Sequence, residues 1–236
     1  MTNDALRGEE YLFHNYSAER LERKAEEILK KYLNGALLVK PQAMDVDHFA
    51  EFYCKATIDF ACLSKDRQTL GLTCFQDGIL IVWDETRTKP KPINVEKGWI
   101  LIDKDVLEFE IEGRVRFTII HECSHSILHP RFYYKKPGSK TPHIECTAYH
   151  IETWPERPPM TDEETREWQA NRLGAALIMP AITVRMLMAA QLGISVDALD
   201  PVYVSDSFIQ EMADVYQVSK SAMRNRLCDL NLLIQQ

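Results

Sequence analysis

The sequence predicts an α+β fold, and three observations support this. A pattern with a helical period opens the chain, short apolar runs with a period of two follow, and helical patterns return after about residue 113. Strands and helices are thus grouped, which favours a small, mostly antiparallel sheet packed against helices. Since 236 residues exceed one typical core, we expect a main domain over residues 1–200 and a C-terminal helical hairpin over residues 201–236, packed on the same domain.

Composition and charge exclude several classes of protein. Hydrophobic residues make up 45% and charged residues 27%, which excludes wholesale disorder. The 28 basic and 35 acidic residues give a net charge of −7, which argues against a protein that mainly coats nucleic acid or anionic membrane. We find no secretory signal and no apolar run near the roughly 20 residues of a membrane helix. The six cysteines include no CxxC pair, so we expect reduced thiols and a cytoplasmic location.

The first half should contain two helices followed by strands. A helix is expected over residues 17–33, stopped by Asn34-Gly35, and a short one with Asp45 as its N-cap. Strand patterns cover residues 56–63, 69–75, 79–83 and about 99–102. We expect the second and third of these to form a hairpin across Gln76-Asp77-Gly78, with a Lys/Pro-rich loop over residues 86–92.

The second half should be mainly helical. A helix over residues 113–129 ends at Pro130, and a long polar loop over residues 131–160 follows. Thr161 to Glu164 form a capping box that opens a helix to about Met179. Pro180 can start the next helix, over residues 181–191, which Gly193 closes.

Residues His121-Glu122-Cys123-Ser124-His125 form an HExxH motif on the helix that follows the strands. Residues i and i+4 lie one turn apart on one helix face, so both imidazoles can reach a single metal ion. Zinc accepts imidazole nitrogen, and a catalytic zinc site has three protein ligands and one open position. Glu122 projects beside the histidines, where it can take a proton from metal-bound water. The spacing therefore predicts a zinc site with Glu122 as general base. The alternative is that two histidines and a glutamate have this spacing by chance.

A third ligand has to come from elsewhere in the chain. Metzincins use a histidine six residues beyond the second one, after a glycine at the third; Arg131 and Leu128 occupy these positions here, which excludes that class. Glu167 fits on a following helix, and Asn171 lies one turn later, where it could orient a ligand histidine through a hydrogen bond. The residues alone leave open whether Glu167 binds metal or is a solvated acid.

Other histidines and one tyrosine are weaker candidates. His129 lies one turn beyond His125, where a residue more often caps the helix or supports a ligand than binds metal. His143, Tyr149 and His150, in the long loop, could donate a hydrogen bond to a developing oxyanion, and the sequence does not select among them.

Three segments together resemble the ImmA/IrrE family of cytoplasmic metallopeptidases. They are the HExxH helix from Phe117, the E-x-x-A-N stretch Glu167-Trp168-Gln169-Ala170-Asn171, and Leu177-Ile178-Met179-Pro180. The pattern V-S-x-x-A-M-R-x-R-L over residues 218–227, the early helices and the sheet also agree, so the resemblance extends from about residue 17 onward. Cys123-Ser124 stands where the family commonly has Leu-Gly, and we expect this departure to change packing rather than chemistry.

The resemblance implies a zincin-like, gluzincin-type domain. Carried over to this sequence, the zinc ligands would be His121, His125 and Glu167, with Glu122 as general base. The implied activity is that of a zinc endopeptidase that cleaves a repressor-like DNA-binding regulator, often encoded beside it on a mobile element or in a stress operon. The alternative is a zinc-containing regulatory or DNA-binding protein of a mobile element or phage, without peptidase turnover.

The C-terminal region could support that alternative. Two short helices, capped by Ser207 and Ser219, have the length of a helix-turn-helix. Lys220, Arg224 and Arg226 place positive charge on the second one, as a DNA contact requires. The simpler expectation is a helical hairpin that completes the core of the main domain.

Overall fold

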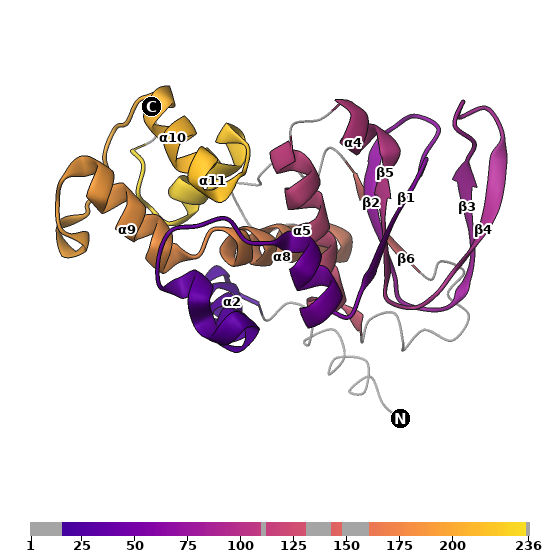
Figure 1. The fold of residues 1–236 in the computed structure, drawn as a ribbon, viewed down its shortest axis with the longest axis horizontal. Coiled ribbons are helices and arrows are strands. Elements are labelled where there is room, and N and C mark those ends of the chain that lie inside the picture. Colours follow the sequence, from indigo (N-terminus) through magenta and orange to yellow (C-terminus); the bar gives the residue numbers. More distant parts are fainter. Residues whose placement is uncertain (1–15, 110–111, 131–142, 148–160, 235–236) are drawn as a thin grey trace.

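A β-sheet region and a group of helices lie side by side in the computed structural model, with helix α5 between them (Figure 1). The structure describes residues 16–109, 112–130, 143–147 and 161–234. The helices and helical turns are α2 (Ala18–Lys31), η1 (Tyr32–Leu38), α3 (Val46–His48), η2 (Phe49–Tyr53), α4 (Lys104–Phe109), α5 (Glu112–Leu128), α8 (Asp162–Ile178), α9 (Ala181–Leu192), η3 (Val196–Ala198), α10 (Asp206–Tyr216) and α11 (Lys220–Asp229). The predicted α+β class is confirmed.

The strands form two sheets. They are β1 (Thr57–Ala61), β2 (Thr69–Cys74), β3 (Gly78–Trp83), β4 (Pro90–Val95), β5 (Trp99–Asp103) and β6 (His143–Thr147). The larger sheet has the order β1-β5-β2-β6, in which β1 runs parallel to β5 while β2 is antiparallel to both β5 and β6. The sheet is therefore mostly antiparallel, as predicted, and its fourth strand lies within the segment that was expected to be a loop.

The predicted hairpin between β2 and β3 is wrong. Strand β3 pairs antiparallel with β4 in a separate two-stranded sheet, with Val82 opposite Lys91. Both edges of β2 are already occupied by β5 and β6, so the chain crosses to a second layer after Cys74. Residues 86–89 of the Lys/Pro-rich segment form a loop, as predicted, but residues 90–92 open β4, where Pro90 and Pro92 are tolerated because β4 is an edge strand.

The larger sheet is covered on both faces. Ile100 and Ile102 of β5 belong to the core shared with the helices, whereas Leu101 between them packs against β3 and β4. Leu72 of β2 also faces the β3–β4 layer. Because side chains alternate along a strand, each of these strands contributes to two hydrophobic cores, which explains why all residues of β2 are buried.

Most helix ends follow the predicted capping residues. Asp45 and Ser219 cap α3 and α11 through their side-chain oxygens, as predicted, and Ser17, expected as the first helical residue, caps α2 in the same way. The capping box that opens α8 is also present. Gly193 ends α9 in the left-handed conformation, which costs glycine no Cβ clash. The cap predicted for α10 is wrong: Ser205 caps it by accepting from the backbone N–H of Phe208, two residues before the expected Ser207.

The C-terminal helices share the main core with α2, α5 and α8. Their buried side chains include Ile209, Met212, Tyr216, Met223 and Leu227. Arg226 of α11 is fully buried, and its guanidinium donates to the Glu22 carboxylate of α2 and to the carbonyl of Met179. This ion pair joins α11 to α2, which is about 200 residues earlier in the sequence. The boundary between residues 200 and 201 stays a prediction.

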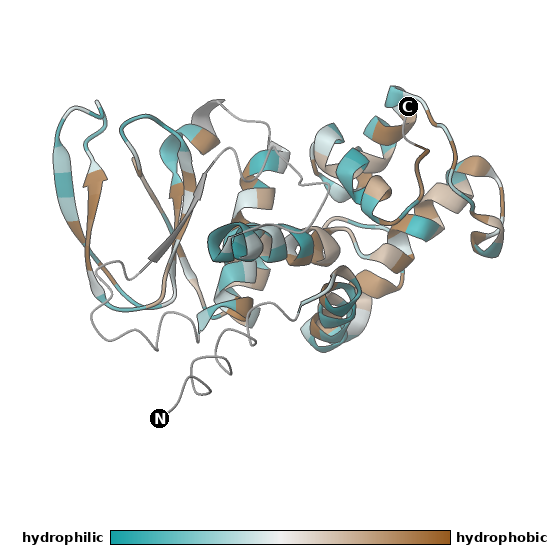
Figure 2. Ribbon diagram, turned by 180° about the vertical axis from the view of Figure 1, so that it is seen from behind, coloured by the Kyte–Doolittle hydropathy of each residue, from teal (hydrophilic) through white to brown (hydrophobic). Residues whose placement is uncertain are grey.

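Helix α2 is amphipathic, with its apolar residues turned inward and mostly hydrophilic residues elsewhere (Figure 2). Within the described segments, no single helix combines the length and apolar character needed to cross a membrane. Helices α8 and α9 reach that length only as a pair with a 55° bend between them.

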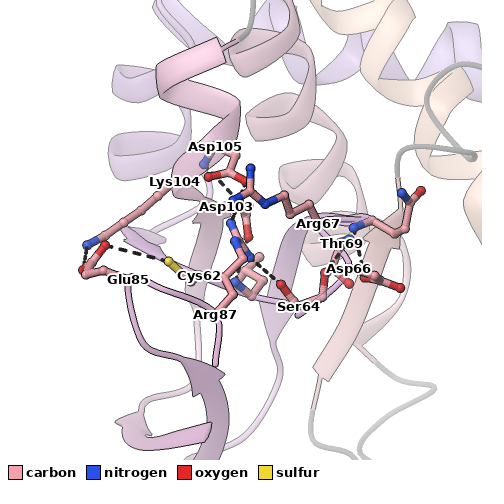
Figure 3. A network of polar contacts seen from close by, with 12 residues as sticks. Cys62, Ser64, Asp66, Arg67, Thr69, Glu85, Arg87, Asp103, Lys104 and Asp105 are labelled. Carbon is pink, nitrogen blue, oxygen red and sulfur yellow. Dashed lines mark hydrogen bonds and ion pairs between the residues drawn. The ribbon is translucent and has the colours of Figure 1, made fainter. Parts of the chain in front are cut away.

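A buried arginine ties the β3–β4 layer to the larger sheet (Figure 3). The Arg87 guanidinium binds the carboxylates of Asp103 and Asp105 and donates to the Ser64 carbonyl. Asp103 also accepts from the backbone N–H of Leu63 at 2.7 Å. Since Arg87 and Asp103 are 5% and 1% exposed, neither charge can be solvated if its partner is removed.

Replacing Arg87 by alanine should therefore lower the free energy of unfolding by about 3–5 kcal/mol, the usual cost of leaving a buried charge unpaired. Arg67→Ala is the matched control, because Arg67 also binds Asp105 and also has a positive φ, but its side chain is 60% exposed. The control should cost about 0–1 kcal/mol. Urea unfolding measures both, and equal losses would contradict the role given to Arg87.

Candidate metal centre

The candidate site lies where α5 packs between the larger sheet and α8. Thr118 and Glu122 share the face of α5 that contacts β2, while His121 and His125 turn toward α8. Gly174 of α8 faces Ile120 and Ser124 of α5, and a Cβ atom at residue 174 would lie 3.5 Å from each, an ordinary contact distance. One helix thus presents different chemical groups to two neighbours.

The structure brings together the two histidines of the motif and Glu167. The Nε2 atoms of His121 and His125 are 2.9 Å apart. The Glu167 carboxylate lies 3.2 Å from His121 Nε2 and 3.4 Å from His125 Nε2. The three side chains are buried, and one donor atom from each lies within 4.8 Å of the others, so the group is compatible with binding one metal ion.

Asn171 lies behind His121, where the sequence predicted an orienting residue. Its Oδ1 is 2.8 Å from His121 Nδ1. An amide oxygen only accepts hydrogen bonds, so Nδ1 of His121 carries a proton, and a neutral His121 therefore has its lone pair on Nε2, where a metal ion could bind. Glu167 and Asn171 are one helical turn apart on α8, which lets the same helix provide the carboxylate and the orienting amide.

His129 does not join the three converging side chains. Its Nδ1 lies 2.9 Å from Nδ1 of His125, on the side of that ring away from Glu167, and its Nε2 lies 3.1 Å from Gln169 Oε1. His129 is 1% exposed, and burial together with the neighbouring His125 holds its pKa well below the usual value. Sequence reasoning missed Gln169, whose only distinguishing feature is its place between Glu167 and Asn171.

Glu122 is held on the other face of α5 by strand β2. The Thr73 hydroxyl lies 2.6 Å from Glu122 Oε2 and donates to this carboxylate, and it also lies 3.1 Å from the Glu122 carbonyl oxygen. Glu122 Oε1 is buried and has no hydrogen-bond partner among the described residues. Sequence reasoning missed Thr73, because nothing in a strand pattern shows which residue will face the motif helix.

Gly71 makes room for this carboxylate. A Cβ atom at residue 71 would lie 2.6 Å from Glu122 Oε1 and 2.9 Å from Thr118 Cγ2, distances that no real contact tolerates. A glycine in a strand interior often marks such a close approach. In this chain, it allows a buried carboxylate to lie directly against the sheet.

Burial and neighbouring charges shift the pKa values of the acidic groups in opposite directions. Burial raises the pKa of Glu122 to about 8, although His121 and the Thr73 hydroxyl act against this shift. Burial acts in the same sense on Glu167, but His125 and His121 outweigh it and hold the pKa of Glu167 well below its usual value. The two carboxyl groups of the site therefore differ in acidity, and Glu167 ionises at a much lower pH than Glu122.

Of the other predicted residues, those that the structure describes lie in β6 and α11. His143 is in β6, opposite Cys74 of β2, while Tyr149 and His150 are outside the described residues. Lys220 and Arg224 of α11 form ion pairs with Asp206 of α10. Arg226 was expected to be available for DNA, but its burial against Glu22 removes it from the surface. The nucleic-acid prediction as a whole stays a prediction.

Gly71→Ala should lower the free energy of unfolding by about 1–3 kcal/mol, because the added methyl group forces Glu122 or the strand to move. Gly174→Ala is the control: its Cβ would have no neighbour closer than 3.5 Å, and alanine is favoured over glycine in a helix by about 0.5–1 kcal/mol. Thermal or urea unfolding checks both variants. A Gly71→Ala protein as stable as Gly174→Ala would show that the close approach is not required.

The comparison with protein families agrees with this geometry. A family model described as the IrrE N-terminal-like domain of the M78 peptidases matches residues 110–228, which include α5, α8 and all three converging side chains. No curated protein matches the chain. Because the family match covers half of the chain, the chain belongs to the ImmA/IrrE family of M78 metallopeptidases.

Proposed function

We propose that this protein is a zinc-dependent endopeptidase with a zincin-like, gluzincin-type domain. The observation that carries the proposal is the buried meeting of two imidazole nitrogens and one carboxylate within 4.8 Å. Two histidines and a glutamate are a known ligand set of catalytic zinc, which leaves a fourth position for water or substrate. A cation at this point also balances a buried carboxylate, which otherwise costs much free energy.

His121, His125 and Glu167 would hold the metal, and Asn171 orients the first of them. Bound zinc would polarise a peptide carbonyl and lower the pKa of a water molecule toward 7. Glu122 would accept the proton of the attacking water and return it to the leaving amine. Thr73 restrains Oε2 of this carboxylate. The pKa of Glu122, about 8, lies near the range in which a group can both take and release a proton at neutral pH.

The proposed substrate is a cytoplasmic, repressor-like DNA-binding regulator. This part rests on membership in the ImmA/IrrE family together with a net charge of −7, which favours a protein substrate over nucleic acid as the partner of the site. The alternative of a DNA-reading zinc protein without turnover has less support. Of the three basic residues that it needs on α11, one is buried and two are paired with Asp206.

Glu167→Ala should lose the metal, because it removes one of three ligands, whereas Glu163→Ala should keep it. Glu163 lies in the first turn of α8, outside the converging group, and its contribution through the helix dipole is only about 0.3–1 kcal/mol. Zinc is measured by elemental analysis after dialysis. Wild type and Glu163→Ala should contain about one zinc per chain, and stoichiometric zinc in Glu167→Ala would refute the ligand assignment.

Glu122→Gln should keep both zinc and fold but lose hydrolysis by about 10²–10⁴-fold, the usual share of general acid–base catalysis. Cells that produce wild type, Glu122→Gln or Glu163→Gln are compared by quantitative mass spectrometry of newly formed peptide termini. A regulator that is cut in the wild type and the Glu163→Gln control but intact in Glu122→Gln is the expected substrate. Identical termini in all three would count against the peptidase proposal.

A further inference from the structure

We infer that His129 and Gln169 are positioning residues that fix the tautomer of His125 and so present its Nε2 lone pair to the metal. The inference rests on the proposed function, since it takes His125 as a ligand. It adds two residues that act through His125 and do not touch the metal. The supporting contacts form a chain from α8 to α5, Gln169 to His129 to His125.

The direction of both hydrogen bonds follows from the amide group of Gln169. Gln169 meets His129 Nε2 through Oε1, at 3.1 Å, and an amide oxygen can only accept. His129 must therefore carry its proton on Nε2. A neutral imidazole has one donor and one acceptor nitrogen, so Nδ1 of His129 is an acceptor.

The hydrogen bond between His129 and His125 then determines which nitrogen of His125 carries the proton. Nδ1 of His125 lies 2.9 Å from Nδ1 of His129, and an acceptor there requires that His125 donates. With its proton on Nδ1, His125 has a free lone pair on Nε2, the atom that lies 3.4 Å from Glu167. The opposite tautomer would point an N–H at the metal position and could not coordinate.

Burial makes this arrangement strict. His125, His129 and Gln169 are 0%, 1% and 1% exposed. A buried donor or acceptor without a partner costs about 1–3 kcal/mol. When the metal occupies the Nε2 lone pairs of His121 and His125, the tautomer that leaves two donors or two acceptors facing each other between His125 and His129 is therefore disfavoured. Water cannot readily replace the missing partner at these exposures.

The two histidine ligands are thus oriented from the same helix by different routes. Asn171 acts on His121 directly, whereas Gln169 acts on His125 through His129. Glu167, Gln169 and Asn171 lie within two turns of α8. The helix segment that provides the carboxylate ligand therefore also determines which ring nitrogen carries the proton in both histidine ligands.

The test measures zinc affinity by competition with a chelator in four variants of the full chain. His129→Leu removes the acceptor and Gln169→Leu removes the group that orients it, so each should weaken zinc binding by about 10–100-fold. His129→Asn places an amide oxygen near the position of Nδ1 and should recover most of the loss. His48→Asn is the control, because His48 is also hydrogen-bonded, to the Tyr32 hydroxyl at 2.8 Å, but lies outside the site.

Long-range proton–nitrogen NMR correlation of the zinc-loaded wild type provides a readout that loss of packing would not mimic. His129 should be protonated on Nε2 and bare on Nδ1, and the opposite tautomer would overturn the inference. Equal zinc affinity of His129→Leu and wild type would also overturn it, as would equal losses in His129→Leu and His129→Asn. Failure of the wild type to bind zinc would instead refute the proposed function on which the inference rests.

Discussion

The packing of α5 against α8 is the constraint on which the site depends, because it places a carboxylate and two imidazoles in one buried space. Glu167 lies 3.2 and 3.4 Å from the two Nε2 atoms, which are themselves 2.9 Å apart. Lone pairs that converge away from water are favourable only around a positive charge.

The face of α5 that contacts the larger sheet carries Glu122. The sheet holds Glu122 through Thr73 and leaves room for it at Gly71, so the proposed general base contacts the sheet while the proposed metal ligands of α5 contact α8. The sheet is in turn kept in place by its second layer, which the buried Arg87 joins to Asp103. Helices α2 and α11, which are far apart in the sequence, are joined by the Arg226–Glu22 ion pair.

Local patterns predicted the parts of this structure that depend on local physics. The helix caps at Asp45 and Ser219 and the i, i+4 spacing of His121 and His125 were all visible in the sequence. What could not be predicted depends on long-range contacts. The pairing of β3 with β4, the contact of Thr73 with Glu122 and the place of Gln169 beside His129 join residues that are tens of positions apart or give no local pattern. Burial of Arg226 likewise depends on Glu22, at the other end of the chain.

The most direct test of the account is X-ray absorption at the zinc K-edge of the loaded wild-type protein, because it identifies the ligand atoms themselves. The account predicts a shell of nitrogen and oxygen ligands at about 2.0–2.2 Å, with the outer-shell scattering of two imidazole rings. Cys123 stands inside the HExxH motif, but it is buried in the hydrophobic core. A sulfur ligand at about 2.3 Å, or scattering from one imidazole alone, would contradict the claim that His121, His125 and Glu167 hold the metal.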